Sequence, residues 1–499
     1  VPNYYVKLES IPLTSNGKVD KKALPDPEGS GLKQGEYLAP VTEIEKKLVK
    51  IWSEVLGVEE DTLSIKADFF DLGGHSIKAI RLLGQTHKQL GVKLALKELF
   101  ASPTIEQLSK LISTSTEKEA YASIPTIKES SDYAVSSAQL RLWVLSRFEG
   151  ANEAYNIPQV VRLEGSLNEE AFSKAFQALL NRHEVLRTIF TEDAEGNPRH
   201  RVLPVTDERF KIRIADYRKV PKDTIDKIIN QYVSDEVSSG FSLEEGPLIR
   251  CSLLKETDSS YVWILVMHHI VSDGWSMAVL HREWSELYNA ELGNRLTNLP
   301  PLSIQYKDYA AWHNAQLQSE DITTHKNYWL EQFKGELPVL ELPSDKPRPK
   351  VMSYNGSSLY RELDKQTTDR LKAFSQQQGG TMFMTLQTAL NILLHKYTGQ
   401  EDIVIGSPIA GREHPDLEGQ IGFYLGALPI RTTFSKEDTV TALYQKIKQN
   451  TLGAYSYQVY PYDQLVDALK LTRDTSRNPL FDVWLDYHSQ EIESEGVNF

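Results

Sequence analysis

The chain has 499 residues, 40% of them hydrophobic and 25% charged, which is typical of a soluble globular protein with two to four domains. Its net charge of −13 comes without any concentrated basic stretch, so the composition argues against a nucleic-acid partner. Because the chain has one cysteine, no run of about 20 apolar residues and no signal peptide, we expect it in the reducing cytoplasm and away from membranes.

Residues 1–36 are too few to form a core of their own. Asn16-Gly17 predicts a tight turn, and Lys18 beside it is, on spacing alone, a solvated surface lysine. Residues 26–34 are polar and glycine-rich, which indicates a linker.

Residues 37–112 predict a small helical bundle. Thr42-Glu-Ile-Glu45 has the pattern of a capping box that opens a helix, a second helix follows Gly73-Gly-His-Ser76, and a third is expected near 97–112. Ser76 stands where a Gly-Gly loop enters a helix. A serine there is by default an N-cap, yet the amides of a helix N-terminus would also favour a phosphodiester on its hydroxyl.

Residues 113–130 are polar, with no apolar period, and are expected to form a linker. Beyond them, strands alternate with amphipathic helices. The expected strands are 157–163, 247–254, 403–405, 427–431 and 481–485, and the expected helices are 168–181, 224–237, 365–378 and 439–452. This region exceeds one ordinary core, so we expect two α/β lobes with a cleft between them.

The stretch Tyr261–Ser276 predicts a buried strand that delivers a reactive loop. Its uncharged first part fits a strand covered on both faces, and the spacing after Ser276 fits an amphipathic helix. Between them lies His268-His269-Ile-Val-Ser-Asp273-Gly274. Backbone N–H groups at a helix start can hold an oxyanion, and a histidine can move protons near neutral pH.

On spacing alone, a histidine pair at a strand end is more commonly structural than catalytic. No third ligand accompanies the pair at the spacing of a metal site, and Cys251 has no second cysteine, so we expect no metal.

Several strings resemble known families. Leu72-Gly-Gly-His-Ser76 resembles the carrier-protein signature, in which the serine carries 4′-phosphopantetheine. His268–Gly274 resembles the HHxxxDG signature of nonribosomal peptide synthetase condensation domains, which are relatives of chloramphenicol acetyltransferase. Asn16–Pro25 looks like the last motif of an adenylation domain, but we expect Lys18 to be inactive without the rest of that domain. Further matches to condensation-domain motifs, in the same order and spacing, are 137–143, 182–190, 306–312, 421–431 and 473–480.

The chain departs from the condensation-domain pattern at two places. Phe423-Tyr-Leu-Gly426-Ala stands where the family usually has Phe-Val-Asn-Thr, and Tyr457-Gln-Val-Tyr-Pro461-Tyr-Asp463 replaces a typical His-Gln-Asp-Tyr-Pro-Phe-Glu. Both departures concern the donor pocket and the contacts between lobes rather than the histidine loop.

The resemblance implies a multidomain fold: a small all-α four-helix carrier bundle followed by a two-lobe α/β condensation domain of the chloramphenicol-acetyltransferase type. The implied parts are a C-terminal remnant of an adenylation domain with its linker over 1–36, the peptidyl carrier over 37–112, a linker over 113–130, the N-terminal lobe over 131–300, and the C-terminal lobe, truncated at its end, over 301–499.

The implied function is peptide-bond formation. The carrier would hold a donor aminoacyl or peptidyl thioester on 4′-phosphopantetheine at Ser76, and the condensation domain would transfer the acyl group to the amine of an aminoacyl group on a downstream carrier. The implied partners are an upstream adenylation domain, the downstream acceptor carrier, a phosphopantetheinyl transferase and the aminoacyl or peptidyl thioesters.

The resemblance also gives expected roles to the residues of the histidine motif. His269, with His268 beside it, acts on the acceptor amine either as a base or as a hydrogen-bond acceptor. Asp273 orders the loop through an arginine, and Gly274 lets backbone approach the oxyanion without a Cβ in the way. The candidate arginines are Arg182, Arg187 and Arg412.

Three rival functions remain at this point. An epimerization domain shares HHxxxDG, but carriers that feed it usually read Gly-Gly-Asp-Ser where this chain has Gly73-Gly-His-Ser76. The covalently linked carrier argues against a free acyl-CoA acyltransferase. A non-catalytic docking module would be favoured by loss of the histidines, which are present.

Overall fold

The computed structural model describes residues 37–115, 121–147, 152–353, 355–471 and 474–488. Residues 1–36, where we expected the adenylation-domain remnant with Lys18, lie outside these ranges, as do part of the 113–130 linker and residues 489–499. The described residues fall into two compact units, one within residues 37–74 and 101–115 and the other within residues 75–100 and 121–488.

The first unit is built on two helices, α1 (Glu43–Leu56) and α4 (Ile105–Thr114), with a short 3₁₀ turn, η1 (Glu60–Thr62), between them in sequence. The expected capping box is present: the Thr42 hydroxyl accepts from the Glu45 amide, and the Glu45 carboxylate accepts from the Thr42 amide at 2.8 Å. Trp52 is fully buried and meets the edge of Phe69 at a centroid distance of 5.1 Å. These aromatic rings form the centre of the small core.

Two further helices follow the Gly-Gly loop, α2 (Ser76–Leu90) and α3 (Leu96–Ala101). The single helix expected near 97–112 was wrong, because Ser102-Pro103-Thr104 divides it into α3 and α4. Pro103 has no N–H to continue a helix, and the Thr104 side chain instead caps α4 by accepting from the Gln107 amide.

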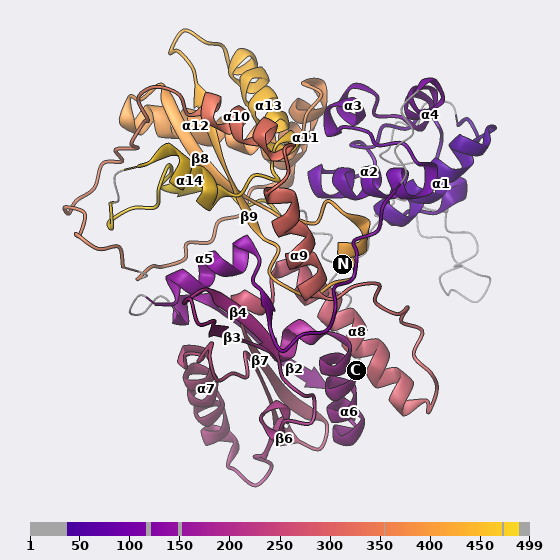
Figure 1. The fold of residues 1–499 in the computed structure, drawn as a ribbon, viewed down its shortest axis with the longest axis vertical. Helices are drawn as coiled ribbons and strands as arrows, with labels where there is room; N and C mark the ends of the chain where they lie inside the picture. The colour runs from indigo at the N-terminus through magenta and orange to yellow at the C-terminus, as the bar shows by residue number, and fades with distance from the viewer. Residues whose placement is uncertain (1–36, 116–120, 148–151, 354, 472–473, 489–499) are drawn as a thin grey trace, which may run out of the picture. The chain divides into compact units, whose positions relative to one another are not determined.

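The central sheet of the second unit has the strand order β2-β7-β6-β5, and its strands are β2 (Asn156–Glu164), β5 (Arg213–Asp216), β6 (Ile249–Thr257) and β7 (Ser260–His268). Strand β7 pairs antiparallel with both neighbours, and all nine of its residues are buried. Helices α6 (Glu169–Arg182) and α8 (Gly274–Leu292) cover one side, and α7 (Lys222–Ser238) covers the other (Figure 1). Covered on both faces, β7 needs the unbroken apolar run that the sequence shows.

A smaller sheet stands beside this one in the order β1-β4-β3, with β1 (Tyr133–Ala134), β3 (Thr188–Glu192) and β4 (Pro198–Val202). Helix α5 (Ser137–Leu145) follows β1 and is opened by a capping box between Ser136 and Gln139. The 3₁₀ turns of this region are η2 (Glu153–Tyr155), η3 (Glu184–Arg187), η4 (Glu208–Phe210) and η5 (His269–Val271).

The C-terminal part carries a third sheet in the order β10-β8-β9, with β8 (Asp402–Ile409), β9 (Gly426–Thr433) and β10 (Val483–Trp484). Its helices and one 3₁₀ turn are α9 (Tyr306–Leu317), α10 (Ile322–Gln332), α11 (Lys365–Gln377), α12 (Met382–Thr398), η6 (Pro415–Leu417), α13 (Val440–Ser456) and α14 (Tyr462–Leu469).

The apolar residues of this unit form a first core from the segments up to α9 and two smaller clusters from residues 329–485, which together make a second core. Tyr306 and Tyr309 of α9 belong to the first core, and so do Ile421, Phe423 and Tyr424, although these follow β8 in sequence. The segment after β8 therefore crosses from the second core to the first, and this crossing builds the site described below.

Most expected strands and helices of this region are observed within one to four residues of their predicted ends. The strand expected at 247–254 begins only at Ile249, because Pro247 has no N–H for a sheet ladder. The strand expected at 481–485 is reduced to the two residues of β10, which pair in parallel with β8. No helix within the described ranges is both long and apolar enough to cross a bilayer.

Candidate active site

The histidine motif lies at the end of β7, in the turn that leads into α8. His268 is the last residue of the strand and is fully buried, whereas His269 opens η5 and is partly exposed. Burial lowers the pKa of His268 to about 3, with the neighbouring His269 contributing in the same direction. His268 is therefore neutral at physiological pH.

The two imidazoles make different hydrogen bonds. His268 Nδ1 accepts from the Ile270 amide at 3.1 Å, so its proton sits on Nε2, which has no partner among the described residues. His269 Nδ1 lies 2.7 Å from the Ser272 carbonyl, which can only accept, so this nitrogen carries the proton and Nε2 is left as an acceptor. His269 is the imidazole that can receive a proton from a bound amine, and His268 is placed to hold the turn.

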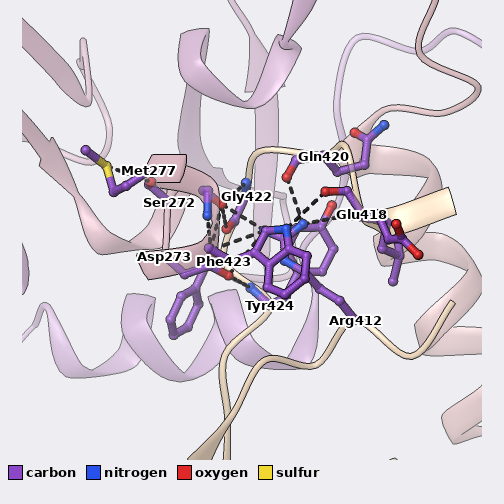
Figure 2. A network of polar contacts seen from close by, with 12 residues as sticks. Ser272, Asp273, Met277, Arg412, Glu418, Gln420, Gly422, Phe423 and Tyr424 are labelled. Carbon is purple, nitrogen blue, oxygen red and sulfur yellow. Dashed lines mark hydrogen bonds and ion pairs between the residues drawn. The ribbon is translucent and has the colours of Figure 1, made fainter. Parts of the chain in front are cut away.

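Asp273 is the N-cap of α8 and is only 1% exposed. Figure 2 shows it among the polar contacts of the turn. Its carboxylate accepts from the Ser276 amide at 2.8 Å and hydroxyl at 2.7 Å, and from the Tyr424 amide at 3.1 Å. Arg412 completes the site with Nη2 at 3.2 Å from Oδ1. With this many donors, the carboxylate has little capacity left to act as a base, and it fixes the turn instead.

Of the three candidate arginines, Arg412 is the one that contacts Asp273. Its guanidinium also donates to the carbonyls of Leu417 and Gln420, at 2.7 Å each, and stacks 4.0 Å from the centroid of the Tyr424 ring (Figure 2). Arg412 follows β8, so this buried pair ties the crossing segment to the start of α8.

Arg182 and Arg187 lie elsewhere. Arg182 donates to Glu283 at 2.9 Å, and that carboxylate also meets His183 Nε2 at 2.6 Å. Arg187 donates to the carbonyls of Leu180 and Leu203. The sequence could not separate the three arginines, because each falls near a family motif and only the path of the chain decides which one reaches Asp273.

The start of α8 offers donors and open space. A Cβ built on Gly274 meets no atom within 4 Å. The Gly274 and Trp275 amides make no hydrogen bond within the described ranges, whereas the next two amides are taken by Asp273. These two free N–H groups, beside His269, could stabilise a developing oxyanion.

Sequence reasoning missed the residues that hold the crossing segment in place. Ser276 Oγ lies 3.0 Å from the Gly422 amide and 2.8 Å from Arg412 Nη2. A Cβ on Gly422 would fall 2.1 Å from the Tyr306 ring, so only glycine allows this approach. Gly422 and Tyr306 both belong to recognised motifs, which could have pointed to their contact.

Ser76 is the first residue of α2 and is partly exposed, and the N-cap position is taken by His75. The serine is therefore not the N-cap that its position suggested. No acidic residue lies in the first turn of α2, whereas α1 has Glu43 and Glu45 there. A phosphodiester on this hydroxyl fits the positive end of the helix.

The described residues contain no group of three or more His, Cys, Asp or Glu side chains that could hold a metal ion.

Comparison with protein families places two known domains on the chain. Residues 129–498 match the family model described as condensation domain, and residues 46–112 match the one described as phosphopantetheine attachment site. The chain belongs to the condensation-domain family. It thus combines a carrier with a domain that forms peptide bonds in nonribosomal peptide synthesis, and the carrier's cofactor is 4′-phosphopantetheine.

Several curated relatives are similar over nearly the whole chain. Bacitracin synthase 3 of Bacillus licheniformis is 41% identical over 100% of this chain, and tyrocidine synthase 3 of Brevibacillus parabrevis is 41% identical over 99%. Gramicidin S synthase 2 of Aneurinibacillus migulanus is also 41% identical, over 99%. The chain spans only 8%, 7% and 11% of the length of these three relatives.

Solved structures give the same fold. The X-domain from teicoplanin biosynthesis is 25% identical, with a TM-score of 0.65 over 73% of this chain and 79% of that one. The first condensation domain of the calcium-dependent antibiotic synthetase, in complex with a substrate analogue, is 19% identical, with a TM-score of 0.57 over 72% of this chain and 80% of that one.

Proposed function

We propose that this chain is a junction between two modules, in which Ser76 carries the donor and His269 serves the acceptor amine. The observation that carries the proposal is the His269 ring, whose Nδ1–H is held by the Ser272 carbonyl so that Nε2 remains an acceptor. The bound 4′-phosphopantetheine would supply a thiol on which the donor acyl group is an activated thioester.

In this proposal each residue of the turn has its own role. His269 Nε2 receives a hydrogen bond, or the proton itself, from the attacking amine, which orients the nitrogen lone pair toward the acyl carbon. The free amides of Gly274 and Trp275 face the oxygen as it gains charge. Asp273, bonded to Arg412, keeps the turn in this shape and does not exchange protons.

In this proposal the parts of the chain are an adenylation-domain remnant with its linker over 1–36, the carrier over 37–112, a linker over 113–130, and the two condensation lobes over 131–300 and 301–499. Its partners are an upstream adenylation domain, a phosphopantetheinyl transferase and an acceptor carrier downstream, and it acts in the cytoplasm. From the motifs we expected tyrocidine synthetase 3 in particular. Because several synthetases share 41% identity with the chain, the proposal covers a synthetase of this group.

The test begins with intact mass after exposure to CoA and a phosphopantetheinyl transferase. One adduct is expected on the wild type and none on Ser76→Ala, and an adduct on that variant would refute the carrier assignment. The loaded chain should then keep a labelled aminoacyl group until an aminoacyl acceptor on a separate carrier is added. A label that becomes epimerized while still on Ser76 would assign the chain to epimerization instead.

A further inference from the structure

Residues 121–130, the later part of the expected linker, are bonded to the condensation domain. Asp416 of η6 accepts from the Tyr121 hydroxyl at 2.8 Å and from the Ile124 amide at 3.1 Å. The Ile124 side chain is 3% exposed and belongs to the first core. One carboxylate and one buried isoleucine therefore anchor a stretch whose sequence has no apolar period.

His414, two residues before Asp416, adds a bond to the backbone of the same stretch. Its Nδ1 accepts from the Asp416 amide at 3.2 Å, and burial lowers its pKa, so the ring is neutral with its proton on Nε2. This nitrogen lies 3.0 Å from the Ala122 carbonyl and donates to it. Since the bond is made to a backbone group, it fixes the path of the linker rather than the position of one side chain.

A second anchor lies at the start of α9. Asp308 accepts from the Ile127 amide at 2.8 Å, and Lys307 pairs with Glu129 at 2.9 Å. Both α9 side chains are nearly inaccessible, at 3% and 6% exposure. Charged groups so deeply buried are costly unless they are paired, and the linker supplies a partner for each. The linker contacts are therefore part of the packing of this domain.

The first anchor lies on the segment that also holds the histidine turn. Arg412, at one end of this segment, pairs with Asp273. Trp275, at the start of α8, donates to the carbonyl of Glu418 at 3.0 Å. Asp416 lies between Arg412 and Glu418 in the sequence. The linker is thus attached to the same segment that fixes the shape of the turn.

The anchors shorten the free length of the tether. An extended chain covers about 3.3–3.6 Å per residue, so the step of about six residues from Ser115 to Tyr121 can span about 20 Å at most. From Ser115 to the start of β1, about 18 residues further on, the limit would be about 60 Å. Effective concentration falls roughly as the −3/2 power of tether length, so a shorter tether keeps its cargo more concentrated at a site within reach.

We propose that residues 121–130 are a fixed part of the condensation domain, and that their anchoring by Asp416 and Asp308 raises the effective concentration of the donor on Ser76. The inference rests on the function proposed above and adds how the donor is kept at the site. Released from Asp416, the linker would be free as far as Ile127. The free length would double from about six to about twelve residues, and the effective concentration would fall about threefold.

Amide hydrogen exchange of the full chain tests the anchoring itself. The Ile124 and Ile127 amides both donate to carboxylates, so they should exchange at least about tenfold more slowly than in an unstructured peptide of the same sequence. In the double variant Ile124→Ala with Asp416→Ala, the amide at position 124 should exchange at the unstructured rate, while the Ile127 amide stays protected. Exchange of both amides at the unstructured rate in the wild type would overturn the proposal.

Transfer rates with two donors test the effect of the tether. In the first arrangement Ser76 carries a labelled aminoacyl group, and in the second the same group is offered to Ser76→Ala protein as its N-acetylcysteamine thioester. Both use an aminoacyl acceptor on a separate carrier. The double variant should slow transfer from Ser76 about threefold and leave transfer from the soluble donor unchanged.

Lys88→Met is the matched control. It removes the contact of Lys88 Nζ with the Asp416 carboxylate, at 3.5 Å, and leaves the hydrogen bonds of the linker in place, so it should change neither rate. An equal loss in Lys88→Met and in the double variant would assign the effect to α2 and overturn the proposal.

Two other outcomes of the double variant would also overturn it. One is an unchanged or faster transfer from Ser76, and the other is an equal loss with both donors, which would place the damage in the histidine turn. If neither donor yields peptide in the wild type, the proposed function fails. The exchange rates of the Ile124 and Ile127 amides then decide by themselves whether the linker is anchored.

Discussion

Removing the Asp273 carboxylate should destabilise the condensation domain strongly, because it deprives Arg412 of its buried counter-ion and α8 of its N-cap. Both side chains are nearly inaccessible, at 2% and 1% exposure. Loss of an N-cap costs about 1 kcal/mol, and an uncompensated charge in a broken buried pair costs about 3–5 kcal/mol. These effects overlap, so we expect Asp273→Ala to lower the free energy of unfolding by about 3–5 kcal/mol.

Thermal unfolding of the condensation domain is the assay. Unfolding entropy of about 2.1 cal/mol/K per residue over a domain of this size makes the expected loss a fall in Tm of about 4–6 °C. Asp273→Asn keeps an acceptor for the cap but not the charge, so its Tm should lie between those of Asp273→Ala and the wild type. The matched control is Asp369→Ala, which breaks an exposed pair with Lys365 on α11 and should not shift Tm measurably. Equal shifts for Asp273→Ala and Asp369→Ala would refute the role given to the buried pair.

Two further predictions concern the glycines and the buried histidines. Gly274→Ala should leave Tm within about 1 °C of the wild type, because its Cβ meets only open space at the start of α8, but it should slow peptide formation at least about tenfold, because that Cβ would stand where the oxyanion approaches the backbone. Gly422→Ala should instead lower Tm, because its Cβ would collide with Tyr306. A loss of Tm in the first variant or none in the second would contradict this contrast. Burial lowers the pKa of His200 to about 4 and that of His268 to about 3. Below pH 6.5 the unfolded chain therefore binds more protons than the folded chain, and the free energy of unfolding falls toward pH 4 by up to about 1.4 kcal/mol per pH unit for each ring. Urea unfolding between pH 7 and 4.5 should show this slope, and His200→Gln should reduce it. The same slope in His200→Gln as in the wild type would count against the claim that His200 is buried in its neutral form.

Local patterns predicted the elements that carry the site. The apolar run before His268 needs cover on both faces and is found as the central strand β7. Thr42 and Glu45 form their capping box because that motif involves only residues three apart. Motif strings pointed to Ser76 and the histidine turn as candidates, since each string is contiguous in the chain.

Long-range contacts could not be predicted in this way. Arg412 reaches Asp273 across 139 residues because the segment after β8 crosses into the first core, and no local pattern records that crossing. The sequence also could not show that His75, rather than Ser76, is the N-cap of α2, because this depends on the backbone angles at the start of the helix. The third carrier helix was overextended because an apolar period continues across Pro103, where the missing N–H ends the helix.

The central claim is that His269 serves the amine while the remainder of the turn holds its shape. The measurement that tests it most directly is the single-turnover rate of transfer of a labelled aminoacyl group from Ser76 to the amine of an aminoacyl acceptor on a separate carrier, in the wild type and in His269→Ala. We predict a fall in rate of at least about a hundredfold in His269→Ala, with Tm within about 1 °C of the wild type, because the ring is partly exposed and its loss removes proton transfer rather than packing. Transfer at the wild-type rate by a folded His269→Ala protein would contradict the account.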